Sequence, residues 1–211
     1  MSRFNRTSRN VPTFSDYTSY RPYLRKDFEY QCAYCEMTEA SVFGIETFGI
    51  DHFKPKKVFP GLICVYENLY YCCNDCNRYK GAVWPSAERT AEGYFFPDPC
   101  ACDPLLDHLQ EGEECRLAAI TKAGSFALEI VRLNREPCLR FRRKRQSVQQ
   151  RIGDYRQLLE FIDPVEIREL LFQTLKELEI EAVECFGQLF DLTRRQHVAD
   201  RGNVPARMVA R

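Results

Sequence analysis

The spacing of hydrophobic residues changes about halfway along the chain. After Thr121, apolar residues recur every three or four positions, which is the spacing of one face of an α-helix. The first stripe is Val148, Ile152, Tyr155, Leu159 and Ile162, and the second is Leu171, Leu175, Leu178, Ala182, Cys185 and Leu189. Between them, Asp163-Pro164-Val165-Glu166 has the order of a helix N-cap, a first-turn proline and a capping-box glutamate. The pattern predicts two long helices that pack antiparallel.

The part of the chain before Thr121 has no such stripe. Glycine and proline separate short apolar pieces, which is typical of hairpins and loops. Residues 65–71 predict a strand or loop, and a short helix is expected from Asn77 onward. Residues 84–104 contain four prolines and predict an irregular connection.

Residues 1–25 lack any period and are rich in Arg, Ser, Thr, Asn and Pro. They predict a basic arm that orders only on its own domain or on a partner. We therefore expect an α+β protein in three parts: the arm, a core at residues 26–100, and a mainly helical region at residues 101–211. A chain of 211 residues that is 45% hydrophobic suffices for one globular domain, or for a small domain with a helical extension.

Composition narrows the class of protein. No segment has the apolar core of a signal peptide or the ~18 to 20 apolar residues of a membrane span, so we expect a soluble, cytoplasmic protein. Eleven cysteines in such a chain indicate reduced thiols, some of them on metal. The net charge is zero, yet residues 138–156 carry seven basic groups against one acidic group. Residues 157–191 carry nine acidic groups against two basic ones, so the average hides basic segments and one acidic helix.

Two C-x-x-C pairs have the spacing of a four-thiolate zinc site. The pairs are Cys32 with Cys35 and Cys73 with Cys76, and each lets two thiolates converge on one ion. Cys72 is a rival for Cys73 but leaves a three-residue gap. Such a closed site is structural, because no coordination position remains for substrate. The alternatives are a chance pairing of buried cysteines and, elsewhere in the chain, a second metal on His108, Cys100 and Cys102.

The stretch between the cysteine pairs carries catalytic chemistry. His52 follows Asp51, and an imidazole with a pKa of about 6.5 can take a proton from water at neutral pH. Asp51 offers a carboxylate oxygen and Asn77 a carbonyl oxygen, both suited to Mg²⁺ or Mn²⁺. Such an ion stabilises charge on a scissile phosphate. Taken alone, an Asp-His pair is usually structural, and its place between the cysteine pairs favours catalysis.

The order Cys-x-x-Cys, Asp-His-x-x-Pro, Asn-Leu, Cys-x-x-Cys-Asn-x-x-Lys resembles the HNH endonucleases. The resemblance implies a ββα-metal core, with His52 as general base and Asp51 and Asn77 as ligands of the catalytic ion. It implies that Asn68 orients the loop and the base. More weakly, Leu133-Asn134-Arg135 and other segments resemble the small HNH proteins encoded beside an ATPase in bacterial anti-phage systems such as Septu and retron cassettes. These resemblances imply a DNA-cleaving subunit with an ATPase partner.

Several basic residues are candidates for phosphate contact. They are Lys54, Lys56, Arg78, Lys80, Arg142 and Arg143, and the last two belong to the basic run at residues 140–145. The alternative for Arg78, Lys80 and the run is a solvent-exposed helix face. His197 has no identifiable partner. The rival functions are a non-catalytic zinc module that binds nucleic acid or a protein, and a thiol redox protein, for which no βαβ pattern is present.

Overall fold

The computed structural model describes residues 2–8, 10–161 and 165–186 of the chain. The strands are β1 (Phe48–His52), β2 (Leu69–Cys73), β3 (Leu109–Glu111) and β4 (Leu117–Ala119). The helices are α1 (Arg21–Asp27), α2 (Asn74–Lys80), α3 (Ala87–Ala91), α4 (Pro104–Asp107), α5 (Lys122–Ile130), α6 (Glu136–Phe161) and α7 (Val165–Phe186). Short 3₁₀ turns lie at Tyr17–Tyr20, Ile45–Thr47, Pro60–Leu62, Tyr66–Asn68 and Glu113–Cys115. This arrangement confirms the α+β class and the helical C-terminal half.

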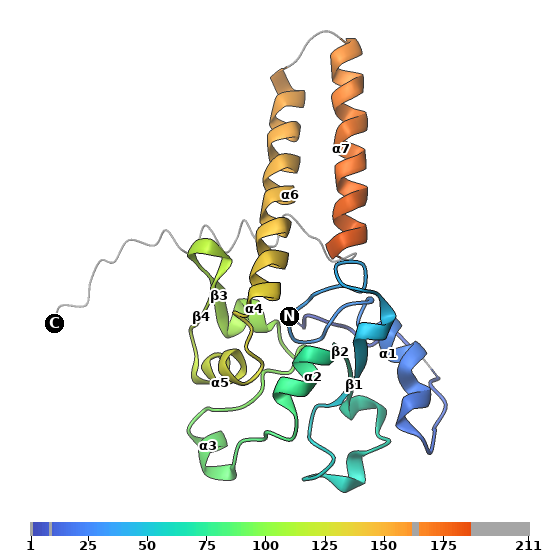
Figure 1. Cartoon of the computed structure of the whole chain (residues 1–211), viewed down its shortest axis with the longest axis vertical. Helices are drawn as coiled ribbons and strands as arrows, with labels where there is room; N and C mark the ends of the chain where they lie inside the picture. Colours follow the sequence, from blue (N-terminus) through green and yellow to red (C-terminus); the bar gives the residue numbers. More distant parts are fainter. Residues whose placement is uncertain (1, 9, 162–164, 187–211) are drawn as a thin grey trace, which may run out of the picture.

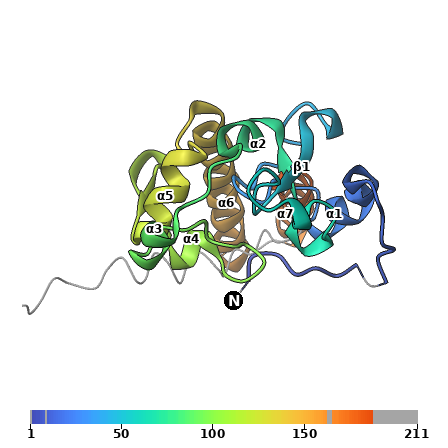
Figure 2. The same cartoon turned by 90° about the horizontal axis from the view of Figure 1, so that it is seen from below.

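A hairpin followed directly by a helix forms the centre of the molecule. Strands β1 and β2 pair antiparallel, with Phe48 opposite Cys73 and His52 opposite Leu69. Helix α2 begins at the residue after β2 and packs on both strands (Figures 1 and 2). The long connection between the strands, residues 53–68, forms a loop beside this unit. The order of these elements along the chain is strand, loop, strand, helix.

Local chemistry explains where α2 begins and ends. All five residues of β2 are buried, and helices α1 and α2 both contact this strand. The helix begins at Asn74 rather than at Asn77 as predicted, because Cys73 is its N-cap and the Cys73 sulfur accepts a bond from the Cys76 N–H. It ends at Gly81, whose φ of 50° favours glycine. The cap therefore lies within the second cysteine pair.

The segment predicted as an arm packs on the core. Phe4, Tyr20 and Leu24 are buried. The guanidinium of Arg6 lies over the rings of Tyr66 and Tyr70 and donates to the Leu69 carbonyl. The predicted boundary between residues 25 and 26 falls inside α1. The second residue of this helix is a proline, which is favourable in the first turn. Arg6 thus anchors the segment to its own domain.

Helices α6 and α7 form the antiparallel pair that the apolar stripes predict. They rise together from the rest of the molecule (Figure 1). Ile152, Leu175, Leu178 and Ala182 are buried. Basic α6 meets acidic α7 through Lys144 with Glu181 and Arg156 with Glu179. The predicted cap at Asp163-Pro164, together with Ile162, Leu189 and His197, lies outside the described residues.

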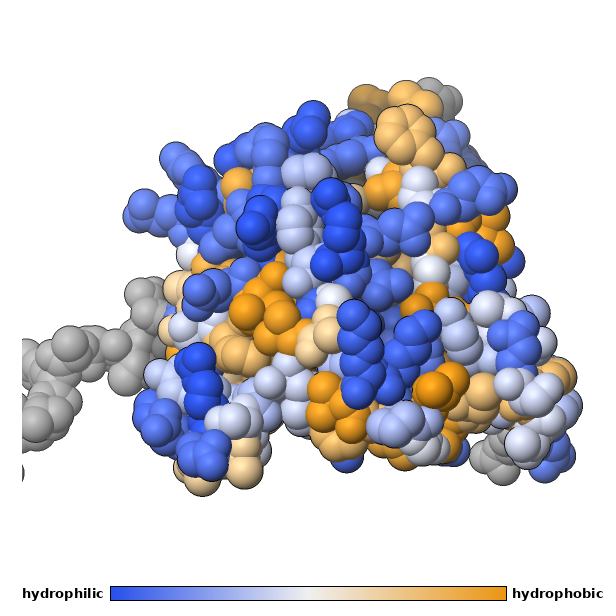
Figure 3. All heavy atoms as spheres, turned by 60° about the horizontal axis from the view of Figure 1, so that its bottom comes forward, coloured by the Kyte–Doolittle hydropathy of each residue, from blue (hydrophilic) through white to orange (hydrophobic). Residues whose placement is uncertain are grey.

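One buried hydrophobic cluster extends through the hairpin, the N-terminal segment and the helical half. The connection predicted as irregular, residues 84–104, contains the short helix α3, which Ser86 caps by accepting from the Arg89 N–H. None of the described helices is long and apolar enough to cross a membrane. On the face in Figure 3, hydrophobic residues form separate small patches among hydrophilic ones.

Candidate functional site

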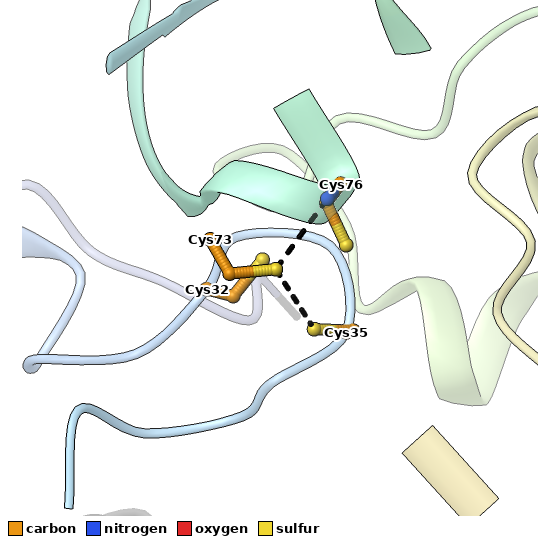
Figure 4. Close-up of side chains that lie close together, drawn as sticks. All are labelled: Cys32, Cys35, Cys73 and Cys76. Carbon is orange, nitrogen blue, oxygen red and sulfur yellow. Dashed lines mark hydrogen bonds between the residues drawn. The ribbon is translucent and has the colours of Figure 1, made fainter. Parts of the chain in front are cut away.

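Four cysteines from two distant segments converge. Cys32 and Cys35 come from the loop after α1, Cys73 ends β2 and Cys76 lies on α2. All four are buried, and their sulfurs lie within 4.8 Å of one another. Figure 4 shows them pointing toward a common centre. The structure selects Cys73 over Cys72, because neighbours along a strand point to opposite faces.

The geometry of the cluster fits a tetrahedral metal. Cys35 Sγ and Cys73 Sγ are 3.8 Å apart, and a tetrahedron with zinc–sulfur bonds of about 2.3 Å has an edge of about 3.8 Å. Burial raises the pKa of the Cys32 and Cys76 thiols. Metal binding must therefore release protons, and affinity falls as the pH is lowered. The cluster could hold a structural metal such as zinc.

A cation missed in the sequence lies against this cluster. Arg135 Nη2 is 3.2 Å from Cys76 Sγ, 3.6 Å from Cys73 Sγ and 3.8 Å from Cys35 Sγ. Its neighbour Asn134 bonds both the N–H and the carbonyl of Leu117 and so fixes the turn before α6 to β4. No spacing rule links Arg135 to cysteines at least 59 residues away. The resemblance of Leu133-Asn134-Arg135 to a known family points to this part of the chain, but it assigns no role to Arg135.

We expect one tightly bound zinc per chain. Cys73→Ser should lose the zinc and much of the stability it supplies, which is roughly 10 kcal/mol in small zinc domains. Metal analysis and thermal unfolding check this. Cys72→Ala is the matched control and should keep its zinc, because Cys72 is buried outside the cluster. A folded wild-type protein without zinc would contradict the assignment, as would a Cys73→Ser protein that keeps both metal and stability.

Asp51 is held by a buried ion pair. Its Oδ2 lies 2.8 Å from Lys80 Nζ and 2.5 Å from the Tyr34 hydroxyl, and Lys80 also donates to the His52 carbonyl at 2.9 Å. Burial raises the pKa of the Asp51 carboxyl, and the ammonium of Lys80 limits that rise. No hydrogen bond to the other oxygen, Oδ1, is found among the described residues.

Lys80 requires a correction. It was predicted to contact phosphate or to lie on an exposed helix face, but its side chain is 0% exposed. Helix α2 covers the hairpin face that carries Asp51, and the last turn of α2 places Lys80 against that carboxylate. A buried ammonium without a counter-ion is strongly unfavourable. Lys80 therefore depends on the Asp51 carboxylate to be buried at this position.

His52 lies at the end of β1 with its ring fixed by two contacts. Nε2 is 3.0 Å from the Ile63 carbonyl, and the Tyr17 ring packs edge-on at 4.8 Å between centroids. A carbonyl only accepts hydrogen bonds, so Nε2 carries the proton and Nδ1 is the basic atom of the neutral ring. Burial lowers the pKa of His52. A lowered pKa favours the neutral imidazole at pH 7.

Two asparagines frame these residues. Asn68 accepts from the Lys54 N–H at 2.8 Å and donates to the Lys54 carbonyl at 3.0 Å, so it ties the two ends of the long loop together. Asn77 donates to the Ile50 carbonyl at 3.2 Å, which leaves its carbonyl oxygen for another partner. A Cβ at Gly49 would come within 3.2 Å of Asn74 and 3.5 Å of Asn77. The missing side chain thus lets α2 approach β1.

The remaining basic candidates divide by exposure. Arg142 is buried at 3% exposure and donates to the carbonyls of Cys115 and Leu133, so its predicted phosphate contact is wrong. The basic run lies on α6, and Arg142 is on the side that packs on the protein. Lys54, Lys56, Arg78 and Arg143 are exposed, and phosphate contact stays a prediction for them.

The second metal site does not form in the described part of the chain. The four-cysteine cluster is the metal-ligand group found there, and His108 Nδ1 instead pairs with the Thr121 hydroxyl at 2.9 Å.

Comparisons with protein families, curated proteins and solved structures find no match to this chain.

Proposed function

We propose that this protein is a metal-dependent HNH endonuclease that hydrolyses phosphodiester bonds in DNA, with a structural zinc and a catalytic Mg²⁺ or Mn²⁺. The observation that carries the proposal is His52: a neutral imidazole, held by the Ile63 carbonyl in one tautomer, at the end of the strand that also carries Asp51. Asn77 stands on the helix that packs over that strand. A zinc module needs only its cysteines, whereas this arrangement supplies a base and two oxygen ligands.

Each residue has a defined task in this reaction. His52 Nδ1 takes a proton from the attacking water, while the bond from Nε2 to Ile63 keeps the ring oriented and stabilises the imidazolium that forms. Asp51 Oδ1 and the Asn77 carbonyl oxygen would hold the divalent ion, which supplies charge stabilisation on the scissile phosphate. Asn68 keeps the loop closed on the base. Lys54 and Lys56 follow His52 on the same loop and would contact the DNA backbone.

A second function has a specific observation in its favour. Asp51 already has Lys80 and Tyr34 as partners, an arrangement that serves folding without any catalytic ion. A non-catalytic zinc module that binds nucleic acid or a protein would use the same fold. The two functions differ in one outcome: only the nuclease needs a second, exchangeable divalent ion.

A plasmid-cleavage assay tests the proposal. Wild-type protein is incubated with supercoiled DNA and Mg²⁺ or Mn²⁺, with and without a chelator that leaves the buried zinc in place. If the protein is a nuclease, we expect nicked or linear DNA, and its formation should depend on the added ion. Protein that retains zinc and binds DNA but gives no cleavage in any assembly would favour the non-catalytic module.

We expect the chain to cleave weakly alone and to work in a complex, as the resemblance to ATPase-associated defence nucleases implies. Its net charge of zero gives little global attraction to DNA. The α6–α7 pair projects from the body, and Leu170, Phe172 and Ile180 on α7 are 69%, 47% and 57% exposed.

Co-expression with the product of the neighbouring gene, followed by size-exclusion chromatography and the cleavage assay, checks this expectation. Leu170→Glu should weaken co-elution, whereas Glu177→Gln, an exposed change on the same helix, should not. A monomer that cleaves efficiently alone and ignores the neighbour would contradict the prediction.

A further inference from the structure

The four-cysteine cluster with a bound metal would carry a negative charge that requires a counter-ion. Four thiolates around one divalent ion carry a net charge of −2, and all four cysteines are buried. A buried anion is unfavourable unless a neighbouring cation or donors compensate it. Arg135 supplies both a positive charge and N–H groups, because one nitrogen of its guanidinium, Nη2, reaches three of the four sulfurs.

The helical half of the chain fixes this guanidinium. Arg135 Nη1 donates to the Val131 and Arg132 carbonyls, at 3.2 and 3.3 Å, in the turn between α5 and α6. Its Nε is buried and has no hydrogen-bond partner among the described residues. Neutral thiols are weak acceptors, so a guanidinium placed against three sulfurs matches thiolates on a metal better than free thiols.

We propose that Arg135 is a positioning residue of the metal centre, which stabilises the metal tetrathiolate by charge and N–H···S bonds and so makes metal retention depend on the docking of α6. The metal then joins three parts of the chain: the loop of Cys32 and Cys35, the start of α2, and the turn before α6. This role is independent of DNA cleavage, and its test measures metal binding alone.

The test compares Arg135→Gln with Arg132→Gln in the full-length protein. Both variants remove one positive charge from the same turn, and both guanidinium groups lie over the Tyr79 ring, but among the described residues only Arg135 of the two bonds the sulfurs. Removing an outer-shell partner of a metal ligand costs about 10- to 100-fold in affinity. In competition with a chromogenic chelator, Arg135→Gln should lose zinc affinity by that factor, and Arg132→Gln should match wild type.

Cobalt(II) substitution gives a readout that a purely structural role would not move. N–H···S bonds stabilise the sulfur lone pairs, so their loss should shift the sulfur-to-cobalt charge-transfer band to longer wavelength in Arg135→Gln but not in Arg132→Gln. Arg135→Lys keeps the charge and loses the planar fork, so we expect a smaller shift and partial recovery of affinity.

Equal zinc affinity and an unchanged cobalt spectrum in Arg135→Gln would overturn the proposal. If that variant fails to fold, Arg135→Lys decides: a chelator release rate and a charge-transfer band identical to wild type would overturn it. A wild-type protein that binds no zinc or cobalt would overturn both the metal centre and this role, whereas an inactive nuclease that behaves as predicted would leave it standing.

Discussion

Replacing His52 with alanine is expected to lower the rate of DNA cleavage by ~10² to 10⁴, since that is the usual contribution of a positioned general base. The reason is geometric: Nε2 is committed to the Ile63 carbonyl, so no other atom of the ring replaces Nδ1 as the base. Cleavage is measured under single-turnover conditions with saturating Mg²⁺. Zinc content and the free energy of unfolding are measured on the same samples, because the ring is largely buried and its loss leaves a cavity.

His108→Ala is the matched control for this variant. His108 also has a ring nitrogen bonded to an oxygen, that of Thr121, but it lies outside the hairpin and α2. The His108→Ala variant should cleave DNA at the wild-type rate. Wild-type cleavage by His52→Ala would remove the hydrolytic assignment from this residue.

Asp51→Asn is expected to destabilise the protein by about 3 to 5 kcal/mol, because it leaves the ammonium of Lys80 buried without a counter-ion. Lys80 is 0% exposed and its ion-pair partner is Asp51 at 2.8 Å. The double variant Asp51→Asn/Lys80→Met removes both charges and should recover most of that loss. Unfolding by urea of the wild type, both single variants and the double variant gives the coupling energy.

Asp75→Asn provides the comparison within the same helix. Asp75 and Arg78 form an exposed ion pair, with side chains 50% and 69% exposed, and such pairs contribute only about 0.2 to 1 kcal/mol. Additive effects of Asp51→Asn and Lys80→Met would show that the buried pair does not act as a unit. The result also bears on catalysis, since a weaker response of an Asp51 variant to Mg²⁺ has meaning only in a protein shown to be folded.

Some of the site residues predicted from the sequence come together as expected, and others are buried away from the predicted role. Cys32, Cys35, Cys73 and Cys76 come together as their spacing predicts, because a C-x-x-C turn fixes two sulfurs locally and needs only one long-range contact to complete the cluster. Lys80 and Arg142 were assigned to phosphate and are buried instead. Their sequence contexts are basic and polar, and a seven-residue helix such as α2 is too short for a pattern that separates its faces.

By itself, the sequence determined the two cysteine pairs, the Asp51-His52 dipeptide and the two long helices, because each is a pattern of residues close together in the chain. Only the tertiary structure decided which nitrogen of His52 is basic, that Lys80 neutralises Asp51, and that Arg135 lies against the cysteine cluster. These contacts join residues 11 to 100 positions apart in the chain. The physical reason is that side-chain partners are set by how the elements pack, and the packing brings together charges that no local spacing connects.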